Sequence, residues 1–496
     1  MEINIHTMNP ISRFFYKLYM FIIAVPGNVW LGIKAAGRGC RSFVFSIGKG
    51  FAAYGMMFAR GDVITKVSFV IVGLGCIVRK QFVKGLVFLL VALALLYFIF
   101  GFGWAYLKDI GTLGVNAETE HLDPDTGLMV YGAADNSMLI LLYSVMTLLV
   151  IVVFLALYYA SVSACYNAQV LMAEGKRLPS FREDIRFLLN EKYHITLLSV
   201  PTVLSAMFVI LPLVFMVLIA FTSFDRNHQP PGNLFSWVGF ENFRDVFGSN
   251  PSKSLTFRYL LQWTVMWAVV ATITNYVLGM LLAMLINKKG VRLKKLWRTI
   301  FVLTIAVPQF VSLLLMRRLF DDQGTMNVIL VRLFGEGAAI NFLSNGTNAR
   351  IMIIIINMWV GVPYSMLITS GILMNIPADL YESARIDGAS PIKTFTKITL
   401  PYMLFVTGPY LITQFVGNFN NFNVIFLLTQ GNPGNVRLYQ AGDTDLLVTW
   451  LYKLTVNFQD YNLASVIGIL VFVISAVLSL IVYNSSSSAK SEEEFQ

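Results

Sequence analysis

The sequence predicts an all-α polytopic membrane protein with about eight transmembrane helices. Of its 496 residues, 56% are hydrophobic and only 13% are charged, and the mean hydropathy is +0.68. A chain of this composition is too apolar for a soluble domain. Apolar runs of about 20 residues, long enough for a helix to cross a bilayer, recur between short polar stretches.

The first 84 residues are predicted to lie on the cytoplasmic surface of the membrane. They contain 11 Lys and Arg but only two acidic residues, and such an excess favours the cytoplasmic side and anionic lipid. The apolar stretches 18–33 and 67–78 are too interrupted or too short to span comfortably, so we expect them to lie in the interface or to re-enter. Surface anchoring is the preferred interpretation, and a regulatory role is the alternative.

Eight candidate spans follow, and the charges of their loops alternate. The spans are expected at 84–108, 138–161, 195–221, 259–286, 299–316, 351–374, 401–429 and 463–483. The loop 108–135 carries six acids and one Lys, whereas 287–298 carries six Lys and Arg and no acid. Counting from a cytoplasmic N-terminus places every basic-rich loop on one side, so both termini are predicted to be cytoplasmic.

This topology divides the chain into four regions. They are a basic N-terminal region (1–84), three spans with external loops (85–260), a core that contains the loop 379–401 (261–484), and a disordered tail (485–496). The basic residues lie beside membrane ends, which is typical of topology signals rather than of a nucleic-acid site. The cysteines Cys40, Cys76 and Cys165 show neither metal spacing nor a disulfide framework, and we interpret them as small apolar residues. The segment DPDTG at 123–127 is interpreted as a turn rather than a calcium loop.

A compact polar segment, 381–401, separates two uncharged runs. Its sequence YESARIDGASPIKTFTKITLP places Glu382, Arg385 and Asp387 within two helical turns and then supplies Gly388, which can bend freely. Pro391 suits the first turn of a second helix, on which Lys393 and Lys397 share one face. We therefore predict a helix, a Gly-Ala turn and a second helix.

This spacing resembles the EAA signature of ABC-importer permeases. Its defined positions are filled by Glu382, Ala384, Gly388, Ile398, Leu400 and Pro401, while Ser383 replaces the first Ala. The resemblance implies a coupling helix that docks on a separate ATPase subunit, and an ordinary amphipathic cytoplasmic loop is the alternative. The implied coupling residues are Glu382, Ala384, Asp387, Gly388, Pro391, Leu400 and Pro401.

Uncharged polar residues interrupt the sixth and seventh spans. The seventh carries Gln414 and four Asn between residues 418 and 423, interleaved with Phe, and the sixth carries Asn357 and Tyr364. Unpaired amides are costly in hydrocarbon, so these residues should face the bundle interior or a cavity. Amides beside aromatic rings suit a neutral polyhydroxylated ligand, and interhelical hydrogen bonding is the alternative for any single residue.

The motifs AVP at 306–308, NMWVGVPY at 357–364 and FVGNFNNF at 415–422, together with the EAA segment, resemble the MalF-type permease of carbohydrate ABC importers. The resemblance implies a type I ABC importer permease fold in a bacterial plasma membrane. It implies substrate contacts at Ile305, Gln309, Asn357, Gly361, Tyr364, Gln414, Asn418 and Asn421. Gly417 stands where the maltose transporter has a stacking Phe, which leaves the identity of the sugar open. The implied partners are a second, MalG-like permease subunit, two ATPase subunits, an extracellular solute-binding protein, the sugar and membrane lipid.

The chain lacks the motifs of an energy-converting enzyme. The nearest fragment to a phosphate-binding loop, GIKAAGRG at 32–39, lacks its ordered elements, so ATP and Mg²⁺ are expected on the partner ATPase, with no cofactor and no metal on this chain. No span core holds a carboxylate, which argues against ion coupling. We therefore expect a non-enzymatic transmembrane subunit for import of a neutral sugar, maltodextrin-like or another oligosaccharide. The alternatives are an ABC permease for another solute such as glycerol-phosphate and, less favoured, a secondary sugar carrier.

Overall fold

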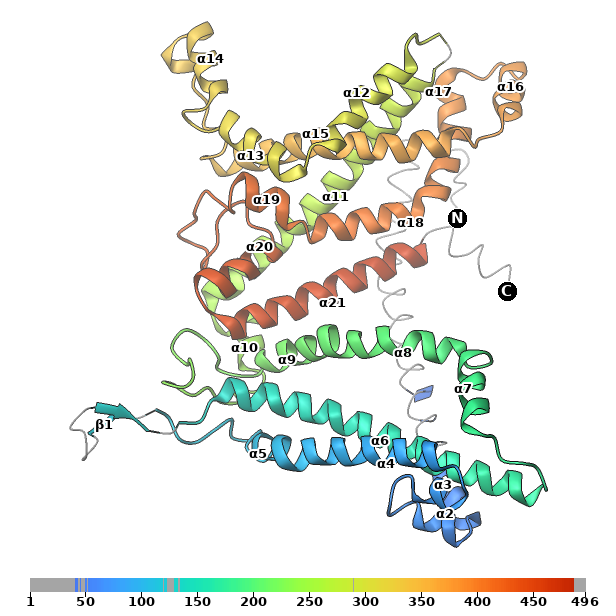
Figure 1. The fold of residues 1–496 in the computed structure, drawn as a ribbon. Helices are drawn as coiled ribbons and strands as arrows, with labels where there is room; N and C mark the ends of the chain where they lie inside the picture. Colours follow the sequence, from blue (N-terminus) through green and yellow to red (C-terminus); the bar gives the residue numbers. More distant parts are fainter. Residues whose placement is uncertain are drawn as a thin grey trace, which may run out of the picture. The chain divides into compact units, whose positions relative to one another are not determined.

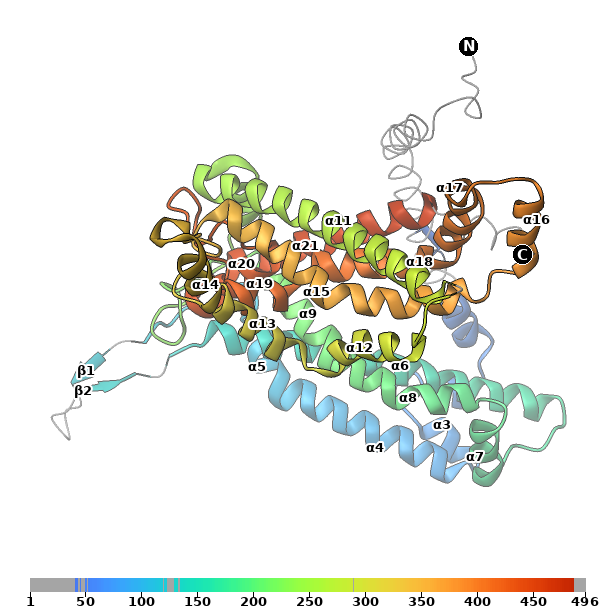
Figure 2. The ribbon, with the colours of Figure 1, turned by 90° about the horizontal axis from the view of Figure 1, so that it is seen from above.

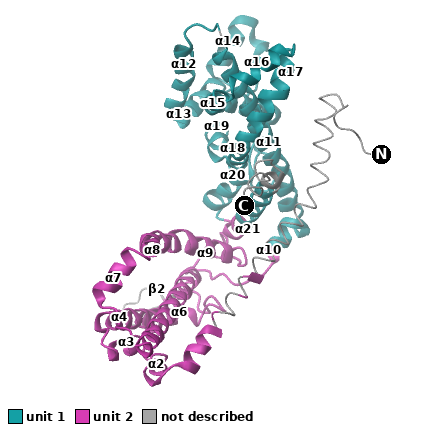
Figure 3. Cartoon of the chain, turned by 90° about the vertical axis from the view of Figure 1, so that its right-hand side faces the viewer, with its two compact units in different colours: residues 1–34, 243–459, 466–496 teal, residues 35–242, 460–465 magenta. Residues whose placement is uncertain are grey.

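The computed structural model describes residues 41–42, 45, 50, 52–118, 120–122, 129–132, 134–288 and 290–485. Its described part is almost entirely helical (Figure 1). It forms two compact units, coloured in Figure 3: an N-terminal unit up to Asn242 with Asp460–Ser465, and a C-terminal unit made of Phe243–Gln459 and the residues from Val466 on. The expectations for 18–33, Cys40, 123–127 and the tail beyond 485 lie outside the described residues.

The described part of the N-terminal unit contains three long apolar helices. Its elements are α2 (Val63–Val67), α3 (Leu74–Val78), α4 (Phe82–Phe98) with α5 (Trp104–Leu107), the hairpin β1 (Glu120–Leu122) and β2 (Met129–Tyr131), α6 (Ser137–Ala173), α7 (Phe181–Leu189), and α8 (Tyr193–Ser205) with α9 (Leu211–Ile219). Asn136 starts α6, because its Oδ1 accepts hydrogen bonds from Met138 N and Leu139 N, both at 3.1 Å. The hairpin was not predicted from the sequence.

The segment 63–78 does not form a span. It folds as α2 and α3, which a nearly buried Arg79 holds together: its Nη2 lies 2.7 Å from Asp62 Oδ1 and 2.9 Å from Thr65 Oγ1. Cys76 and Cys165 are both buried thiols. The expectation that 67–78 does not cross the membrane as a helix therefore agrees with the structure.

The C-terminal unit is organised around one long helix, α11. Its elements are α11 (Pro251–Asn287), α12 (Lys294–Ala306), α13 (Gln309–Leu319), α14 (Thr325–Phe334), α15 (Gly346–Leu373), α16 (Ala378–Ile386), α17 (Pro391–Thr394), α18 (Leu400–Phe419), α19 (Phe422–Leu428), α20 (Leu447–Tyr452) and most of α21 (Tyr461–Ser485), while α10 (Glu241–Arg244) spans the boundary between the units. Figure 2 shows α11, α15 and α18 running alongside one another, and α11 contacts both α15 and α18.

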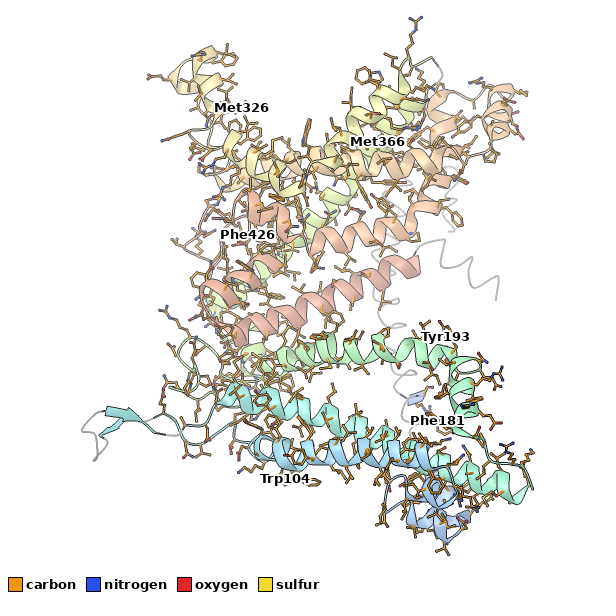
Figure 4. All side chains as sticks on the ribbon, in the orientation of Figure 1. Trp104, Phe181, Tyr193, Met326, Met366 and Phe426 are labelled. Carbon is orange, nitrogen blue, oxygen red and sulfur yellow. The ribbon has the colours of Figure 1, made fainter. Side chains whose placement is uncertain are left out.

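Small residues and side-chain hydrogen bonds allow these three helices to pack closely. A Cβ built at Gly279 of α11 would lie 2.5 Å from Ser365 Cβ of α15, so the two backbones approach closely, as small residues allow in membrane bundles. On the other side, Tyr276 Oη lies 2.8 Å from Thr407 Oγ1 of α18. Met366 of α15 packs between α11 and α12 (Figure 4).

Among the residues that the structure describes, six helices are long and apolar enough to cross a membrane, and the pair α12–α13 would make a seventh. The six match the first, second, third, fourth, sixth and eighth predicted spans. The fifth predicted span, 299–316, is sharply bent: α12 and α13 meet at 87° around Val307-Pro308, so the pair is a broken span or a re-entrant loop. Proline lacks the N–H that a helix needs and favours an extended residue before it, and Val307 has φ −78° and ψ 126°.

The seventh predicted span, 401–429, is also broken. The 20-residue helix α18 is long enough to cross a membrane, but its polar residues make it less apolar than the six helices above. The helix is interrupted at Asn420-Asn421, and α19 begins after this interruption. Asn421 starts α19 because its Oδ1 accepts a hydrogen bond from Val424 N at 3.1 Å.

Candidate functional site

The C-terminal unit contains a cavity of about 330 Å³ lined by α11, the α12–α13 bend, α15, α18 and the α18–α19 break. Both helix breaks contribute to its wall, because Val307, Pro308 and Asn421 line it. Its volume is at the lower end of the range of about 300–1,000 Å³ for small-molecule pockets.

All eight residues assigned to substrate contact from the sequence line this cavity. They are Ile305, Gln309, Asn357, Gly361, Tyr364, Gln414, Asn418 and Asn421. The structure adds Asn275, Thr304, Ser312 and Trp359. These residues come from four separate stretches of sequence, and the fold brings them together.

The lining is polar but uncharged. The described residues that line the cavity include no Asp, Glu, Lys, Arg or His. They offer amide and hydroxyl groups, together with the half-exposed rings of Trp359 and Tyr364. Such a surface can exchange hydrogen bonds with hydroxyl groups while ring faces cover apolar C–H groups.

Two of the predicted amides are engaged in the fold itself. Asn418 Nδ2 donates to Thr272 Oγ1 at 3.0 Å, and the backbone carbonyl of Asn418 accepts from Trp267 Nε1 at 3.0 Å. Asn421 caps α19, as described above. For these two residues, hydrogen bonding between helices and helix capping explain in part why an amide occurs within the seventh span.

Two other amide side chains that line the cavity have buried atoms without a hydrogen-bond partner among the described residues. Asn275 is 7% exposed and Asn357 is 4% exposed. Asn275 Oδ1 and Asn357 Nδ2 are buried and have no hydrogen-bond partner among the residues that the structure describes. A buried polar group without a partner costs about 1–3 kcal/mol, so these two atoms call for a ligand or water.

Gly361 also lines the cavity, and because it has no side chain it leaves room for a neighbouring amide. A Cβ built at this position would overlap the Asn275 amide, at 2.6 Å from Cγ. Asn275 was not among the site residues predicted from the sequence, although it is an uncharged amide inside the fourth span. The polarity argument used for the sixth and seventh spans would have found it.

The second candidate element is the polar segment 379–401. The structure forms the predicted helix, turn and helix: α16, a turn at Gly388 with φ +69°, then α17, which begins at Pro391 and continues into α18 at Leu400-Pro401. Gly388 N donates to Arg385 O at 3.0 Å and Ala389 N donates to Ala384 O at 2.9 Å, which closes α16. The positive φ is the reason that glycine suits this position.

One face of this segment is anchored and the other is open. Ala384 is buried, Tyr381 Oη lies 3.0 Å from Thr399 Oγ1, and Tyr381, Phe395 and Leu400 pack against a core around Met280 and Met403. The open face carries the charged residues Glu382, Arg385 and Asp387 and two strongly exposed isoleucines, Ile386 (87%) and Ile392 (76%). Figures 1 and 2 place α16 and α17 at the opposite end of α15 from α14.

Comparison with known proteins agrees with this geometry. Residues 275–490 match the family described as the binding-protein-dependent transport system inner membrane component. The chain is 36% identical over 428 residues to the galactooligosaccharides transport system permease protein GanP of Bacillus subtilis, covering 85% of this chain and 97% of that protein. It is 39% identical over 249 residues to the maltose/maltodextrin transport system permease protein MalF of Klebsiella aerogenes, covering 49% of this chain and 48% of that protein.

A solved structure shares the fold. A chain of a bacterial ABC transporter involved in import of the acidic polysaccharide alginate superposes with a TM-score of 0.50 and 22% identity, covering 61% of this chain and 98% of that one. The expected type I ABC importer permease fold is confirmed. The chain therefore belongs to the family of binding-protein-dependent ABC-importer permeases, as a multi-pass transmembrane subunit of the MalF type.

Proposed function

We propose that this chain is one of two permease subunits of an importer that moves a neutral oligosaccharide into the cell. The observation that supports this most is the uncharged cavity, which gathers amides, hydroxyls and two aromatic rings from four stretches of the chain. The names of its relatives point the same way, since GanP is named for galactooligosaccharides and MalF for maltose and maltodextrin. The substrate class is therefore a short galacto- or gluco-oligosaccharide.

The lining argues against the alternative solutes. An anionic solute such as glycerol-phosphate would enter this cavity without any cationic partner among the described lining residues, and an unpaired buried charge is strongly disfavoured. A carrier driven by protons or sodium ions typically needs an ionisable group within the membrane. The described lining holds none.

The energy is proposed to come from two separate ATPase subunits, which hold ATP and Mg²⁺, while this chain has no cofactor. The open face of α16–α17 is the proposed docking site, because it combines charges with the exposed Ile386 and Ile392. Exposed apolar side chains grouped on a polar segment are typical of an interaction surface.

The proposed orientation is supported by the basic link 288–298 at one end of the C-terminal unit. The basic link 288–298 follows Asn287, the last residue of α11. Asn287 Nδ2 donates a hydrogen bond to Ser370 Oγ of α15 at 2.9 Å, so the link begins near the end of α15 that leads to α16. We place that end, and both termini, in the cytoplasm of a bacterial cell. The opposite end, with α14, then faces the solute-binding protein. A MalG-like second permease subunit completes the pathway.

The test is uptake by proteoliposomes that contain the complete transporter and its binding protein. Radiolabelled maltotriose and β-1,4-galactotriose are the probes, with unlabelled glycerol 3-phosphate as competitor. We expect one trisaccharide to accumulate only with ATP on the ATPase side, unaffected by collapse of the proton gradient or by the competitor. Uptake that survives without the ATPase and stops when the gradient collapses would show a secondary carrier instead.

Asn421→Leu should lower sugar uptake by about tenfold, because it removes an amide from the cavity wall together with the cap of α19. Stimulation of ATP hydrolysis by the sugar-loaded binding protein should fall much less. The matched control is Asn420→Leu, since Asn420 is exposed, its side chain donates to Val416 O of the preceding helix α18 at 3.2 Å, and it does not line the cavity. Equal uptake by Asn421→Leu and wild type would remove Asn421 from the site.

A further inference from the structure

We propose that Asn275 of α11 and Asn357 of α15 form a subsite that holds one hydroxyl group of the transported sugar, and that Gly361 is glycine in order to admit Asn275. This inference rests on the proposed function, and it gives α11, from which no site residue was predicted, a part in the site.

The subsite is distinguished from the other amides by its unused groups. Asn418 and Asn421 use their side chains to bond Thr272 and to cap α19. Asn275 and Asn357 are as deeply buried, yet Asn275 Oδ1 and Asn357 Nδ2 have no hydrogen-bond partner within the described chain. Both residues line the cavity. The fold therefore keeps two amides at the cavity wall that it does not use to bond its own helices.

The free atoms define the chemistry of the missing partner. Asn275 offers a free acceptor and Asn357 offers a free donor. A hydroxyl group donates one hydrogen bond and accepts others, so one hydroxyl can serve both atoms. A carboxylate or phosphate oxygen could only accept, and an ammonium group could only donate. The pair therefore fits a hydroxyl group better than a carboxylate, phosphate or ammonium group.

Gly361 fixes the position of the subsite. It lies one helical turn after Asn357, so the two residues share a face of α15. A Cβ at Gly361 would occupy the space of the Asn275 amide, at 2.6 Å from Cγ. The same two helices touch at Gly279 and Ser365. The subsite is thus carried by a closely packed helix pair, which suits precise recognition.

The experiment compares the imported trisaccharide with its series of monodeoxy analogues in proteoliposomes that contain the complete transporter. For the wild type, we expect one monodeoxy analogue to be imported at least about tenfold less efficiently in kcat/KM, because it leaves both buried amides unpaired. In Asn275→Ala this discrimination should shrink to within about twofold, while the other analogues keep their wild-type ranking.

Gly361→Ala provides an independent test. It should reproduce the loss of discrimination when Asn275 is present, because the new methyl group displaces the amide. In the Asn275→Ala background it should add almost nothing, since the overlapping atoms are gone, so the two changes are strongly non-additive.

The matched control is Asn287→Ala. Asn287 is an amide on the same helix, bonded to Ser370 (2.9 Å) and Arg298 (3.1 Å) and absent from the cavity lining. It should keep the deoxy discrimination of the wild type, whatever its effect on the overall rate.

The results separate the two proposals. If neither trisaccharide is imported by the wild type, the proposed function fails and the hydroxyl subsite fails with it. If sugar is imported but Asn275→Ala keeps the discrimination, slows all analogues equally, or is additive with Gly361→Ala, only the subsite is overturned.

Discussion

Replacing Glu382 with Lys should abolish ATP-driven uptake while the transporter still assembles. Glu382 lies on the open face of α16 and forms no ion pair among the described residues, so its loss leaves the fold of this chain unchanged. Its charge is available to a partner, and the proposed contact is a cationic residue of the ATPase. A Lys at this place would set like charges against each other, which costs several kcal/mol at an interface.

The measurements are sugar uptake, stimulated ATP hydrolysis and co-purification of the subunits. We expect uptake and stimulation to fall by about 100-fold or more, because a loss of about 3 kcal/mol in the coupled state corresponds to that factor. Glu191→Lys reverses an equally exposed charge outside the segment and should leave uptake near the wild-type rate. Normal uptake by an assembled Glu382→Lys transporter would contradict the assignment of α16 to coupling.

The parts of this molecule that could be predicted from its sequence are those with local causes. The segment around Gly388 is specified by residues within two turns of one another, and its helix, turn and helix appear as expected. The cavity residues of the sixth and seventh spans could be found because amides inside apolar runs need a reason to be there.

The helix breaks were harder to predict, because proline in a membrane helix has no single outcome. Pro201 and Pro363 lie inside continuous helices, whereas Pro308 lies at an 87° bend. The difference depends on whether neighbouring helices compensate for the lost hydrogen bond, which is a tertiary property. A proline at 308 therefore permitted the bend but did not require it.

Asn275 and the buried ion pair Asp445–Lys453 also have roles that depend on tertiary contacts, which local sequence does not reveal. The sequence shows Asn275 as an amide inside an apolar span, but only the fold shows that it lies against Gly361. Asp445 lies in a loop that the sequence marks only as polar, yet it is fully buried. Spacing alone does not indicate which loop carboxylate the fold will enclose, because the enclosing groups come from both sides of it in the chain.

Lys453→Met should destabilise the C-terminal unit by about 3–5 kcal/mol, the usual cost of removing one partner of a buried ion pair. Lys453 Nζ lies 2.6 Å from Asp445 Oδ2, and the same carboxylate accepts hydrogen bonds from Gly442 N at 2.8 Å and Thr449 Oγ1 at 2.9 Å. Gly431 packs so closely that a Cβ there would overlap the carboxylate. Without Lys453, a buried negative charge keeps its hydrogen bonds but loses its counterion.

The check is thermal unfolding of the purified protein in detergent at several pH values. Burial raises the pKa of Asp445 above its ordinary value. A carboxyl group whose pKa is higher in the folded state stabilises that state at acid pH, and the contribution is lost as the pH rises through the folded pKa. The deficit of Lys453→Met should therefore be smaller near pH 5 than near pH 8, because the variant lacks the ammonium group, which is the strongest interaction opposing protonation of Asp445.

Two further variants separate this explanation from general damage to the loop. Asp445→Asn combined with Lys453→Met leaves no charge to bury and should recover part of the lost stability. Lys253→Met breaks a more exposed ion pair of the same unit, with Asp245 at 3.0 Å, and should cost no more than about 1 kcal/mol. If Lys453→Met unfolds at the same temperature as Lys253→Met, with no dependence on pH, then burial of the carboxylate does not hold this loop in place.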